Sequence, residues 1–259
     1  MIIESLFSLQ GRVALITGAA GGIGRVLSEG MADAGAAVAL ADVRADETMA
    51  LAASIRREGR QAEAFRVDVV RRESIRSLVD GVLGRFERID ILVNCAGINR
   101  REPLLDVTED TFDRILAVNL RGVFQLSQAV AEPMIRQGGG KIIHIGSLTG
   151  EMALAGVSAY GVSKAGVSQL AMSMAIEWAR HNIQVNCIVP GFMRTELTTA
   201  LWADEAKAAW MRGRIAAERP GEPDELLGTA ILLASPASSY ITGQTWCVDG
   251  GVTAGGRHW

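Results

Sequence analysis

Three side chains suited to proton transfer lie in one stretch of this sequence: Ser147, Tyr160 and Lys164. Tyr160 and Lys164 are four positions apart, so on a helix they project from one face, one turn from each other. Ser147 follows an apolar run, 141–146, that is typical of a buried strand, and open parallel sheets bind ligands at the carboxyl ends of their strands. A hydroxyl, a phenol and an ammonium group can therefore converge, which predicts a proton-transfer site. Since Tyr-x-x-x-Lys pairs are common, the prediction depends on the rest of the chain.

A glycine-rich turn near the start of the chain predicts the cofactor class. The segments 12–17 and 37–42 are short apolar runs typical of strands, and 25–34 has helical spacing. Between the first strand and the helix lies the turn 18–24. A strand, a glycine turn, a helix and a second strand form the βαβ unit that binds a dinucleotide.

Each glycine of this turn has a separate predicted role. Gly18 permits the tight turn, Gly22 lets the backbone approach a pyrophosphate, and Gly24 allows close contact between helix and sheet. The N–H groups at the helix start then bind the phosphates. The order of the glycines is Gly-x-x-x-Gly-x-Gly, which differs from the Gly-x-Gly-x-x-Gly of the standard dinucleotide fingerprint.

Asp42, at the end of the second strand, predicts which dinucleotide binds. A carboxylate there can accept hydrogen bonds from both ribose hydroxyls of the adenosine half, and it repels a 2′-phosphate. Gly21 occupies the position where a basic residue would favour the phosphorylated cofactor. Arg25 and Arg44 are the nearby exceptions, although both can be solvated charges. We predict NAD.

The alternation of helices and strands continues along the chain. Helical segments are expected at 46–58, 71–86, 108–137, 165–180 and 222–234, and strands at 62–67, 89–93, 141–146, 183–189 and 244–249. This pattern predicts an α/β fold, a Rossmann-type doubly wound sheet in one domain spanning 1–259. The segment 192–219 follows a strand end and contains no strand-like run, so it is predicted to be a substrate lid.

Polar residues at further strand ends are candidates for the same site. Asp68 is expected to hold the adenine amino group. Asn94 has two explanations of equal weight, a contact to the cofactor or a structural bond between strand ends. Asn119 falls within an apolar helical face, where a buried amide needs a partner, and both a site role and a structural role explain it.

The composition excludes several other classes of protein. The chain has 259 residues, a net charge of −3 and 49% hydrophobic residues, which argues against a nucleic-acid surface. Three separated cysteines without CxxC or neighbouring histidines argue against disulfides and metal sites. No signal peptide or apolar run long enough to span a bilayer is recognised. We therefore expect a soluble cytoplasmic protein without a membrane partner or a metal.

Taken together, these motifs resemble those of the short-chain dehydrogenases/reductases, from about residue 11 to residue 251. The shared motifs are Thr17-Gly18-x-x-x-Gly22-Ile23-Gly24, Asn94-x-Ala96-Gly97, Asn119, Ser147, Tyr160-x-x-x-Lys164, Pro190-Gly191 with Thr195, and Val248-Asp249-Gly250-Gly251. Cys95 departs from the family pattern, which usually has Asn there. The resemblance implies seven parallel strands with helices on both faces, and a homotetramer.

The resemblance also implies roles for individual residues. Tyr160 would be the base, and Lys164 would support it and bond the nicotinamide ribose. Ser147 would bind the substrate oxygen, and Asn119 would hold a water that links Lys164 to solvent. Thr195 and the backbone at Met193 would hold the carboxamide. The predicted cofactor-binding set is Gly18, Gly22, Ile23, Gly24, Asp42, Asp68, Val69, Asn94, Ala96, Gly97, Tyr160, Lys164, Pro190, Gly191, Met193 and Thr195.

The substrate is predicted from two further segments, 98–104 and 195–204, which look like those of the gluconate 5-dehydrogenase and 2-deoxygluconate 3-dehydrogenase group. Arg100 or Arg101 could pair with a sugar-acid carboxylate, or both could be solvated loop charges. We predict hydride transfer with a sugar acid or polyol. The alternatives are a 3-oxoacyl carrier-protein reductase or other ketone reductase, and a non-catalytic dinucleotide-binding regulator, against which the intact Ser147, Tyr160 and Lys164 set argues.

Overall fold

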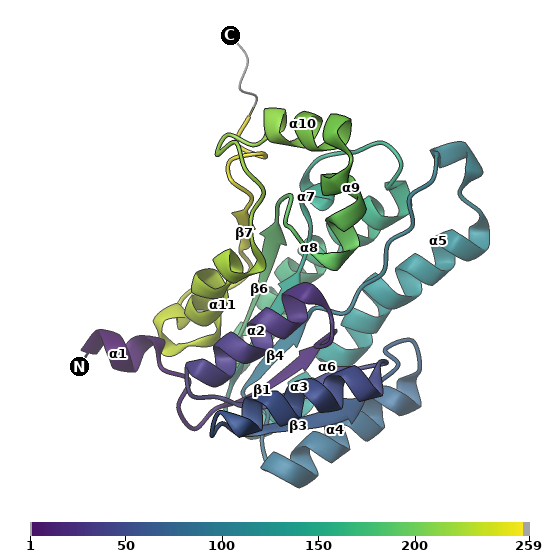
Figure 1. Ribbon diagram of the computed structural model, residues 1–259. Helices are drawn as coiled ribbons and strands as arrows, with labels where there is room; N and C mark the ends of the chain where they lie inside the picture. Colours follow the sequence, from purple (N-terminus) through teal and green to yellow (C-terminus); the bar gives the residue numbers. More distant parts are fainter. Residues whose placement is uncertain (1, 256–259) are drawn as a thin grey trace.

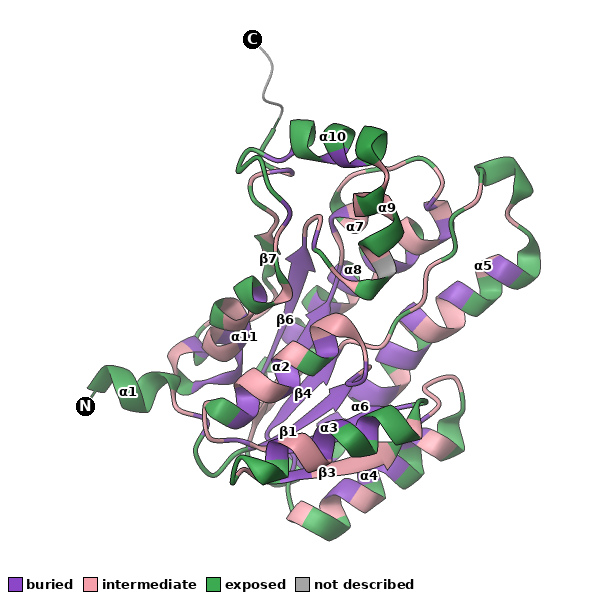
Figure 2. Cartoon of the chain, viewed as in Figure 1, coloured by how far each residue is buried: buried purple, intermediate pink, exposed green. Residues whose placement is uncertain are grey.

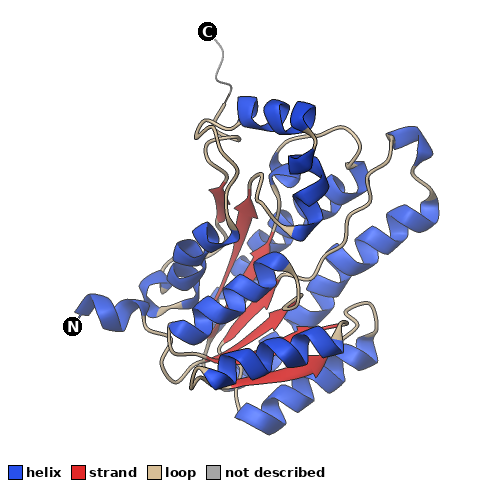
Figure 3. Cartoon of the chain, viewed as in Figure 1, coloured by secondary structure: helices blue, strands red, loops and turns tan. Residues whose placement is uncertain are grey.

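Seven apolar runs form one parallel sheet in the computed structural model, which describes residues 2–255 (Figure 1, Figure 3). The strand order is β3-β2-β1-β4-β5-β6-β7. The strands are β1 (Val13–Thr17), β2 (Ala37–Asp42), β3 (Ala62–Arg66), β4 (Ile91–Asn94), β5 (Gly140–Ile145), β6 (Ile183–Pro190) and β7 (Thr245–Val248). The predicted seven-stranded Rossmann-type sheet is thus confirmed.

The central strands are mainly apolar because helices cover the sheet on both faces. Every residue of β1 and β6 is buried, as expected for the central strands of a parallel sheet. Side chains alternate between two cores: Val13 and Leu15 belong to one, and Ala14 and Ile16 belong to the other. Figure 2 shows this burial concentrated in the strands and the inner helix faces.

Three helices cover each face of the sheet. Side chains of α4 (Arg72–Phe86), α6 (Val123–Arg136) and α8 (Ser158–Trp178) fill the first core. Those of α2 (Gly22–Asp33), α3 (Ala45–Arg57) and α11 (Leu227–Ala234) fill the second. The remaining α-helices are α1 (Ile2–Phe7), α5 (Glu109–Leu116), α7 (Leu148–Glu151), α9 (Thr199–Ala203) and α10 (Glu205–Arg214). The sequence did not predict α1 or α7, which are short.

The stretch predicted as one helix from 108 to 137 is interrupted. It consists of α5, a wide π-helical turn η2 (Ala117–Gly122) and then α6. The α5 helix begins at Thr108, whose side chain accepts a hydrogen bond from the N–H of Thr111, as expected for an N-cap. The π turn lies in the middle of an otherwise helical pattern, which is where such turns accompany functional residues.

The segment between β6 and α11 is tied down at its two ends. Met193 and Gly221 form a β-bridge, the N–H of Arg194 donates to the carbonyl of Gly221 (2.8 Å), and the N–H of Gly221 donates to the carbonyl of Phe192 (3.0 Å). Between these ends lie the short turn η4 (Glu196–Thr198), α9 and α10, which Figure 1 shows above the carboxyl ends of the strands.

Candidate active site

The glycine turn lies at the point where the strand order reverses, because β1 is followed by β2 and β3 on one side and by β4 on the other. Gly18 has φ of +69°, and a Cβ atom there would lie 2.7 Å from the backbone nitrogen of Ala96, after β4. A Cβ on Gly24 would overlap the carbonyl oxygen of Gly18. The turn can therefore close only with glycine at both positions.

The N-terminus of α2 opens onto this turn. Its N-cap residue is Gly21, so no side chain occupies the N–H groups of the first turn, which includes Ile23. Gly22 faces the segment after β6, since a Cβ on Gly22 would lie 3.4 Å from Cβ of Thr195. Free N–H groups at the start of a 12-residue helix, beside backbone without side chains, fit a pyrophosphate.

Asp42 ends β2 beside this turn and is 6% exposed. One carboxylate oxygen accepts a hydrogen bond from the N–H of Ala20 (3.1 Å), and the other accepts one from the N–H of Arg44 (3.0 Å). The Arg44 guanidinium folds back, with Nε 3.5 Å from the same carboxylate and NH1 2.9 Å from Glu47. Oδ1 accepts from both the N–H and Nε of Arg44, whereas Oδ2 keeps one lone pair. The group can therefore accept one hydroxyl in this arrangement, and a second one where Nε of Arg44 moves away.

Tyr160 and Lys164 lie on successive turns of α8, as their spacing predicts. Nζ of Lys164 is 5.7 Å from the centre of the Tyr160 ring. Lys164 is 4% exposed and donates to the carbonyl oxygen of Ile145 at 2.7 Å, the last residue of β5. Because Ser147 lies two residues after that strand end, this bond brings α8 to the end of β5 from which Ser147 extends.

Ser147 is the N-cap of the short helix α7, and its contacts define which hydrogen bond it can still make. Its Oγ atom accepts from the N–H of Thr149 (3.2 Å) and from the hydroxyl of Thr149 (3.0 Å). A hydroxyl has two acceptor lone pairs and one donor proton. With both lone pairs engaged, the proton of Ser147 is the group left to donate to a ligand.

Asn119 reaches the same place from the π turn η2 and is fully buried. Its Oδ1 accepts the N–H of Ile98 (2.8 Å), while Nδ2 donates to the carbonyl of Ile98 (2.9 Å) and to Oγ of Ser163 (3.0 Å). Gly97 marks its proximity to the lysine. A Cβ atom on Gly97 would lie 3.4 Å from Oδ1 of Asn119 and 3.6 Å from Nζ of Lys164.

Asn94 is bonded inside the protein rather than towards the strand end. It is 2% exposed, and its Nδ2 lies 3.1 Å from both Oγ of Ser127 and Nδ1 of His144. Of the two explanations for Asn94, these contacts favour the structural one. Burial and, second, the charge of Lys164 lower the pKa of His144 to about 3, so this imidazole is neutral.

Other predicted cofactor residues lie at the same carboxyl edge of the sheet. Oδ1 of Asp68 accepts the N–H of Val70 (3.0 Å), which fixes the turn after β3. Val69 packs against the π turn, since a Cβ on Gly122 would lie 3.0 Å from the Val69 carbonyl. Pro190 ends β6. Gly191 lies against the turn after β7, since a Cβ atom on Gly191 would lie 2.5 Å from Cα of Asp249.

Met193 and Thr195 follow β6 and are bonded to the start of the predicted lid. The carbonyl of Met193 accepts from Oγ1 of Thr198 (2.6 Å) and from the indole N–H of Trp202 (3.2 Å). The N–H of Thr195 donates to Oγ1 of Thr198 (2.9 Å). This places the base of α9 beside Gly22, because Thr195 is the residue that faces Gly22.

The two predicted substrate arginines differ in their surroundings. Nε of Arg100 lies 2.9 Å from a carboxylate oxygen of Glu102, and its NH1 donates to Oγ1 of Thr111 (3.3 Å). Glu102 in turn bonds the loop before Tyr160, its N–H donating to the carbonyl of Gly156 (3.0 Å). Both arginines are exposed, Arg100 with 66% of its side chain. They differ in that Arg100 bonds Glu102 and Thr111, within a loop that contacts the segment before Tyr160.

Three residues of this region were not singled out from the sequence: Ser163, Glu102 and His144. Ser163 lies inside the Tyr-x-x-x-Lys motif, and a buried serine one turn after the tyrosine was the available signal. Glu102 offered a carboxylate beside two arginines. His144 lies in an apolar strand, and nothing in its spacing distinguishes it from a core residue.

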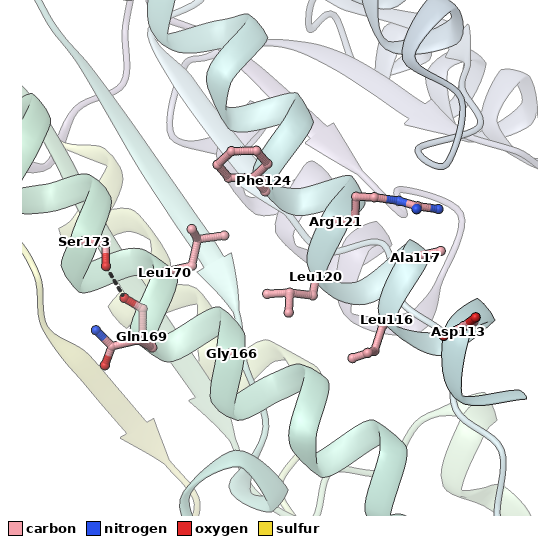
Figure 4. Close-up of a pocket in the computed structure, with 10 residues that line it drawn as sticks. All are labelled: Asp113, Leu116, Ala117, Leu120, Arg121, Phe124, Gly166, Gln169, Leu170 and Ser173. Atoms are coloured by element: carbon pink, nitrogen blue, oxygen red, sulfur yellow. Dashed lines mark hydrogen bonds between the residues drawn. The ribbon is translucent and has the colours of Figure 1, made fainter. Parts of the chain in front are cut away.

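A groove of about 700 Å³ lies between α8 and the helical segment formed by α5, η2 and α6 (Figure 4). Leu116, Leu120 and Phe124 line one wall, and Gly166 and Leu170 of α8 line the other, with Asp113 and Arg121 at the rim. The groove is predominantly apolar and does not include the predicted catalytic residues.

Two classes of site are not found in residues 2–255. These residues contain no group of three or more His, Cys, Asp or Glu side chains arranged to hold a metal ion. No helix among them is long and apolar enough to cross a membrane.

Comparisons with known proteins agree with this geometry. Residues 18–253 match a family model described as enoyl-(acyl carrier protein) reductase. The chain is 41% identical to a 5-keto-D-gluconate 5-reductase from Escherichia coli (strain K12), over 96% of this chain and 98% of that protein. It is 41% identical to a gluconate 5-dehydrogenase from Gluconobacter oxydans (strain 621H), over 96% and 97%.

Among solved structures, it resembles a gluconate 5-dehydrogenase from Burkholderia cenocepacia J2315 in complex with NADP and tartrate. The TM-score is 0.95 at 43% identity, and the match covers 98% of this chain and 99% of that one. The predicted resemblance to the gluconate dehydrogenase group is confirmed. Fold, motifs and relatives together establish that the chain belongs to the short-chain dehydrogenase/reductase family.

Proposed function

We propose that this protein is an NAD-dependent oxidoreductase that transfers hydride between the nicotinamide and a secondary alcohol or ketone of a sugar acid or polyol. The observation that supports this most directly is the buried Lys164, held at the end of β5 with its ammonium 5.7 Å from the Tyr160 ring. The proposed catalytic residues are Asn119, Ser147, Tyr160 and Lys164.

Tyr160 is the proposed base. Hydride leaves an alcohol carbon only as the hydroxyl loses its proton, and a free phenol ionises at about pH 10. An ammonium group beside a phenol stabilises the phenolate, and a positioned base contributes roughly 10²- to 10⁴-fold to the rate. Ser147 would donate its free proton to the substrate oxygen and so fix the reacting carbon. Bound NAD would supply the hydride acceptor.

Asn119 and Gly97 would complete the path for the proton. The absence of a side chain at Gly97 leaves room between Oδ1 of Asn119 and Nζ of Lys164. A water in this region would link Lys164 to solvent, as proposed for Asn119. Lys164 would also bond the nicotinamide ribose, and Thr195 with the backbone at Met193 would hold the carboxamide.

Replacing Tyr160 with Phe tests the mechanism. The assay follows absorbance of the reduced cofactor with NAD or NADP and a panel of gluconate, 2-deoxygluconate, polyols and simple secondary alcohols. The wild-type chain should turn over at least one sugar acid or polyol, and Tyr160→Phe should lose at least 100-fold of the rate while still binding cofactor. Turnover that survives in Tyr160→Phe would contradict the mechanism.

The preference for NAD rests on Asp42. Its buried carboxylate has acceptor capacity left for ribose hydroxyls, and a 2′-phosphate would meet a negative charge there. The Burkholderia cenocepacia relative, in contrast, is in complex with NADP. Arg44, which lies against Asp42 and the glycine turn, is the residue of this chain that could offset that repulsion.

For the substrate, we propose that Arg100 rather than Arg101 binds the carboxylate of a sugar acid. A guanidinium has five N–H donors, and the contacts to Glu102 and Thr111 account for two of them. The remaining donors can still bind a carboxylate. Because Glu102 already holds Arg100 in place, little side-chain entropy is lost when the substrate binds.

Arg101 provides a matched control for this proposal. Arg100→Met should raise KM for a sugar acid by about 10-fold or more, which corresponds to about 1.4 kcal/mol, and leave KM for a neutral polyol unchanged. Arg101→Met should leave both values unchanged. If the two variants behave alike, or if Arg100→Met affects both substrates equally, the carboxylate assignment is wrong.

The ketone-reductase alternative uses the same residues in reverse. The family model's description names an acyl-carrier-protein reductase, but the sugar-acid relatives match across 96% of the chain. We therefore keep the sugar acid as the first candidate substrate.

We also propose that residues 192–219 act as a lid over the substrate. The bonds at 192–194 and 221 fix the two ends, so α9 and α10 could move between them as a unit. Phe192 and Trp210 pack edge to face, with ring centroids 6.2 Å apart, which holds α10 to the base of the segment.

Finally, we propose a homotetramer in the cytoplasm. The apolar groove of Figure 4 lies between two catalytic helices, and a second copy covering it would bury Phe124, which is 41% exposed. Light scattering tests the assembly, and a monomer would refute it. The three cysteines, Cys95, Cys187 and Cys247, are all free, and a reducing compartment would keep them so.

A further inference from the structure

We propose that Ser163 is a positioning residue of the catalytic site, and that it holds the amide of Asn119 against the helical turn of Tyr160. This inference rests on the proposed function, because it concerns how the proposed catalytic residues are oriented. Ser163 itself is fully buried and lies on the side of α8 that faces the π turn.

The Ser163 hydroxyl makes two contacts of opposite kind. Its Oγ donates to the carbonyl oxygen of Tyr160 at 2.7 Å, and it accepts a hydrogen bond from Nδ2 of Asn119 at 3.0 Å. The donor proton is therefore committed to the main chain of Tyr160. This leaves a lone pair aimed at Asn119 and fixes the direction from which the amide is held.

The amide of Asn119 has no other side-chain partner in these contacts. Its oxygen and one of its N–H groups are bonded to the backbone of Ile98, and the second N–H group is bonded to Ser163. All of its hydrogen-bonding capacity except one oxygen lone pair is thereby used inside the protein. Ser163 is thus the link between Asn119 and α8, while Ile98 is the link to the loop after β4.

The hydrogen bond between Asn119 and Ser163 joins two elements whose relative position sets the distances between the proposed catalytic side chains. Asn119 is on the π turn, and Tyr160 with Lys164 is on α8. Removal of the Ser163 hydroxyl would leave one N–H of a fully buried amide without a partner. The amide would keep its two bonds to Ile98 but lose its bond to α8, so the π turn would no longer be held to the helical turn of Tyr160.

Ser163→Ala tests the proposal, and Ser168→Ala is the matched control on the same helix. Ser168 is 8% exposed, and its hydroxyl contacts Glu151 and Cys187 instead of Asn119. We expect Ser163→Ala to lower kcat about tenfold, as for the loss of about 1.4 kcal/mol of transition-state stabilisation. KM for substrate and cofactor should stay within about twofold, and the rise of kcat with pH should move to higher pH.

Two further measurements separate positioning from simple packing. Ser163→Thr restores the hydroxyl and should recover most of kcat, whereas Ser163→Val, which has the size of threonine without its hydroxyl, should not; equal recovery in both variants would mean that the alanine acts only through the void it leaves. In protein labelled with ¹⁵N-asparagine, the side-chain amide signal of Asn119, assigned by its loss in Asn119→Asp, should shift in Ser163→Ala and not in Ser168→Ala.

The amide signal keeps this proposal distinct from the proposed function. If no alcohol or ketone is turned over by the wild-type chain, the proposed function fails, and the Asn119 signal still decides whether Ser163 holds the amide. An unchanged kcat and pH profile in Ser163→Ala, an equal loss in Ser168→Ala, or an unmoved Asn119 signal would each overturn the positioning role.

Discussion

Asp42→Ala is the change that most sharply tests how this protein selects its cofactor. We expect the carboxylate to accept ribose hydroxyls, and a hydrogen bond to a charged group contributes about 1.5–3 kcal/mol. Loss of one such bond should lower kcat/KM with NAD by about 10- to 150-fold. With NADP, kcat/KM should hold or rise, because the charge that repels the 2′-phosphate is gone and Arg44 is released from it.

The same change has a stability cost that can be measured separately. The N–H of Ala20, which is 4% exposed, loses its acceptor. An unsatisfied buried donor costs about 1–3 kcal/mol, and each kcal/mol lowers Tm by about 2–4 °C for a chain of this size. Calorimetry of the free protein measures this loss of stability. Steady-state kinetics with both cofactors, at a temperature well below Tm, measures the preference for NAD over NADP.

Asp46→Ala is the control, since Asp46 is an exposed carboxylate in the first turn of the following helix. It should alter neither cofactor preference nor Tm by more than about 1–2 °C. An equal loss with NAD and NADP in Asp42→Ala would mean that the carboxylate only supports the fold. An unchanged kcat/KM with NAD would refute its contact with the ribose.

Three further outcomes follow from the geometry. Gly24→Ala should abolish cofactor binding in calorimetric titration or prevent folding, because the added Cβ would overlap the carbonyl of Gly18, whereas Gly84→Ala, where the added Cβ meets nothing, should be tolerated. Burial raises the pKa of Asp90, but hydrogen bonds from two arginines and a backbone N–H outweigh burial, and the net pKa is lowered. The stability that the Asp90 carboxylate adds is therefore fully present above the unfolded pKa of about 3.9, and it is lost as pH falls through the folded pKa. Asp90→Asn should therefore lower the free energy of unfolding by about 1.5–3 kcal/mol at pH 7, and urea titrations should show the deficit shrinking only below about pH 4. His144 is buried and its pKa is lowered to about 3, so on acidification the unfolded chain binds a proton at this residue before the folded chain does. The free energy of unfolding should therefore fall by up to about 1.4 kcal/mol per pH unit between about pH 6.5 and pH 3. His144→Asn should reduce this pH dependence in urea titrations, and an unchanged slope would contradict the neutral buried imidazole.

Most of the sheet could be predicted because its central strands are buried on both faces and are mainly apolar. The run 183–189 is apolar at five of its seven positions, with Gln184 and Asn186 as the polar exceptions, and this composition is typical of a buried strand. Once the strands are predicted, their carboxyl ends are known, and so is the edge of the sheet at which Gly18, Asp42 and Ser147 lie. The observed boundaries differ from the predicted ones by one or two residues, as at β4, which begins at Ile91 rather than 89.

What could not be predicted depends on contacts between elements. The start of α8 at Ser158, rather than 165, depends on the turn after Gly156, which has φ of +78°. The difference between Arg100 and Arg101 depends on Glu102 and Thr111, whose positions are fixed only once the loop has folded. Neither the start of α8 nor the contacts of Arg100 can be predicted from the local spacing of apolar residues.

The π turn η2 lets α5 and α6 pack against different parts of the protein although they form one continuous helical segment. In an uninterrupted α-helix, Ile115 and Leu126 would be nearly in phase, since eleven residues make about three turns. The wider turn rotates the second half relative to the first. Leu126 packs in the first sheet core, whereas Ile115, equally buried, belongs to neither sheet core. A π turn accommodates one extra residue, so deleting one residue between 120 and 122 should leave Ile115 and Leu126, then ten residues apart on an unbroken α-helix, in about their present relative orientation. The two halves would keep their packing, and only the wide turn that carries Asn119 would be lost.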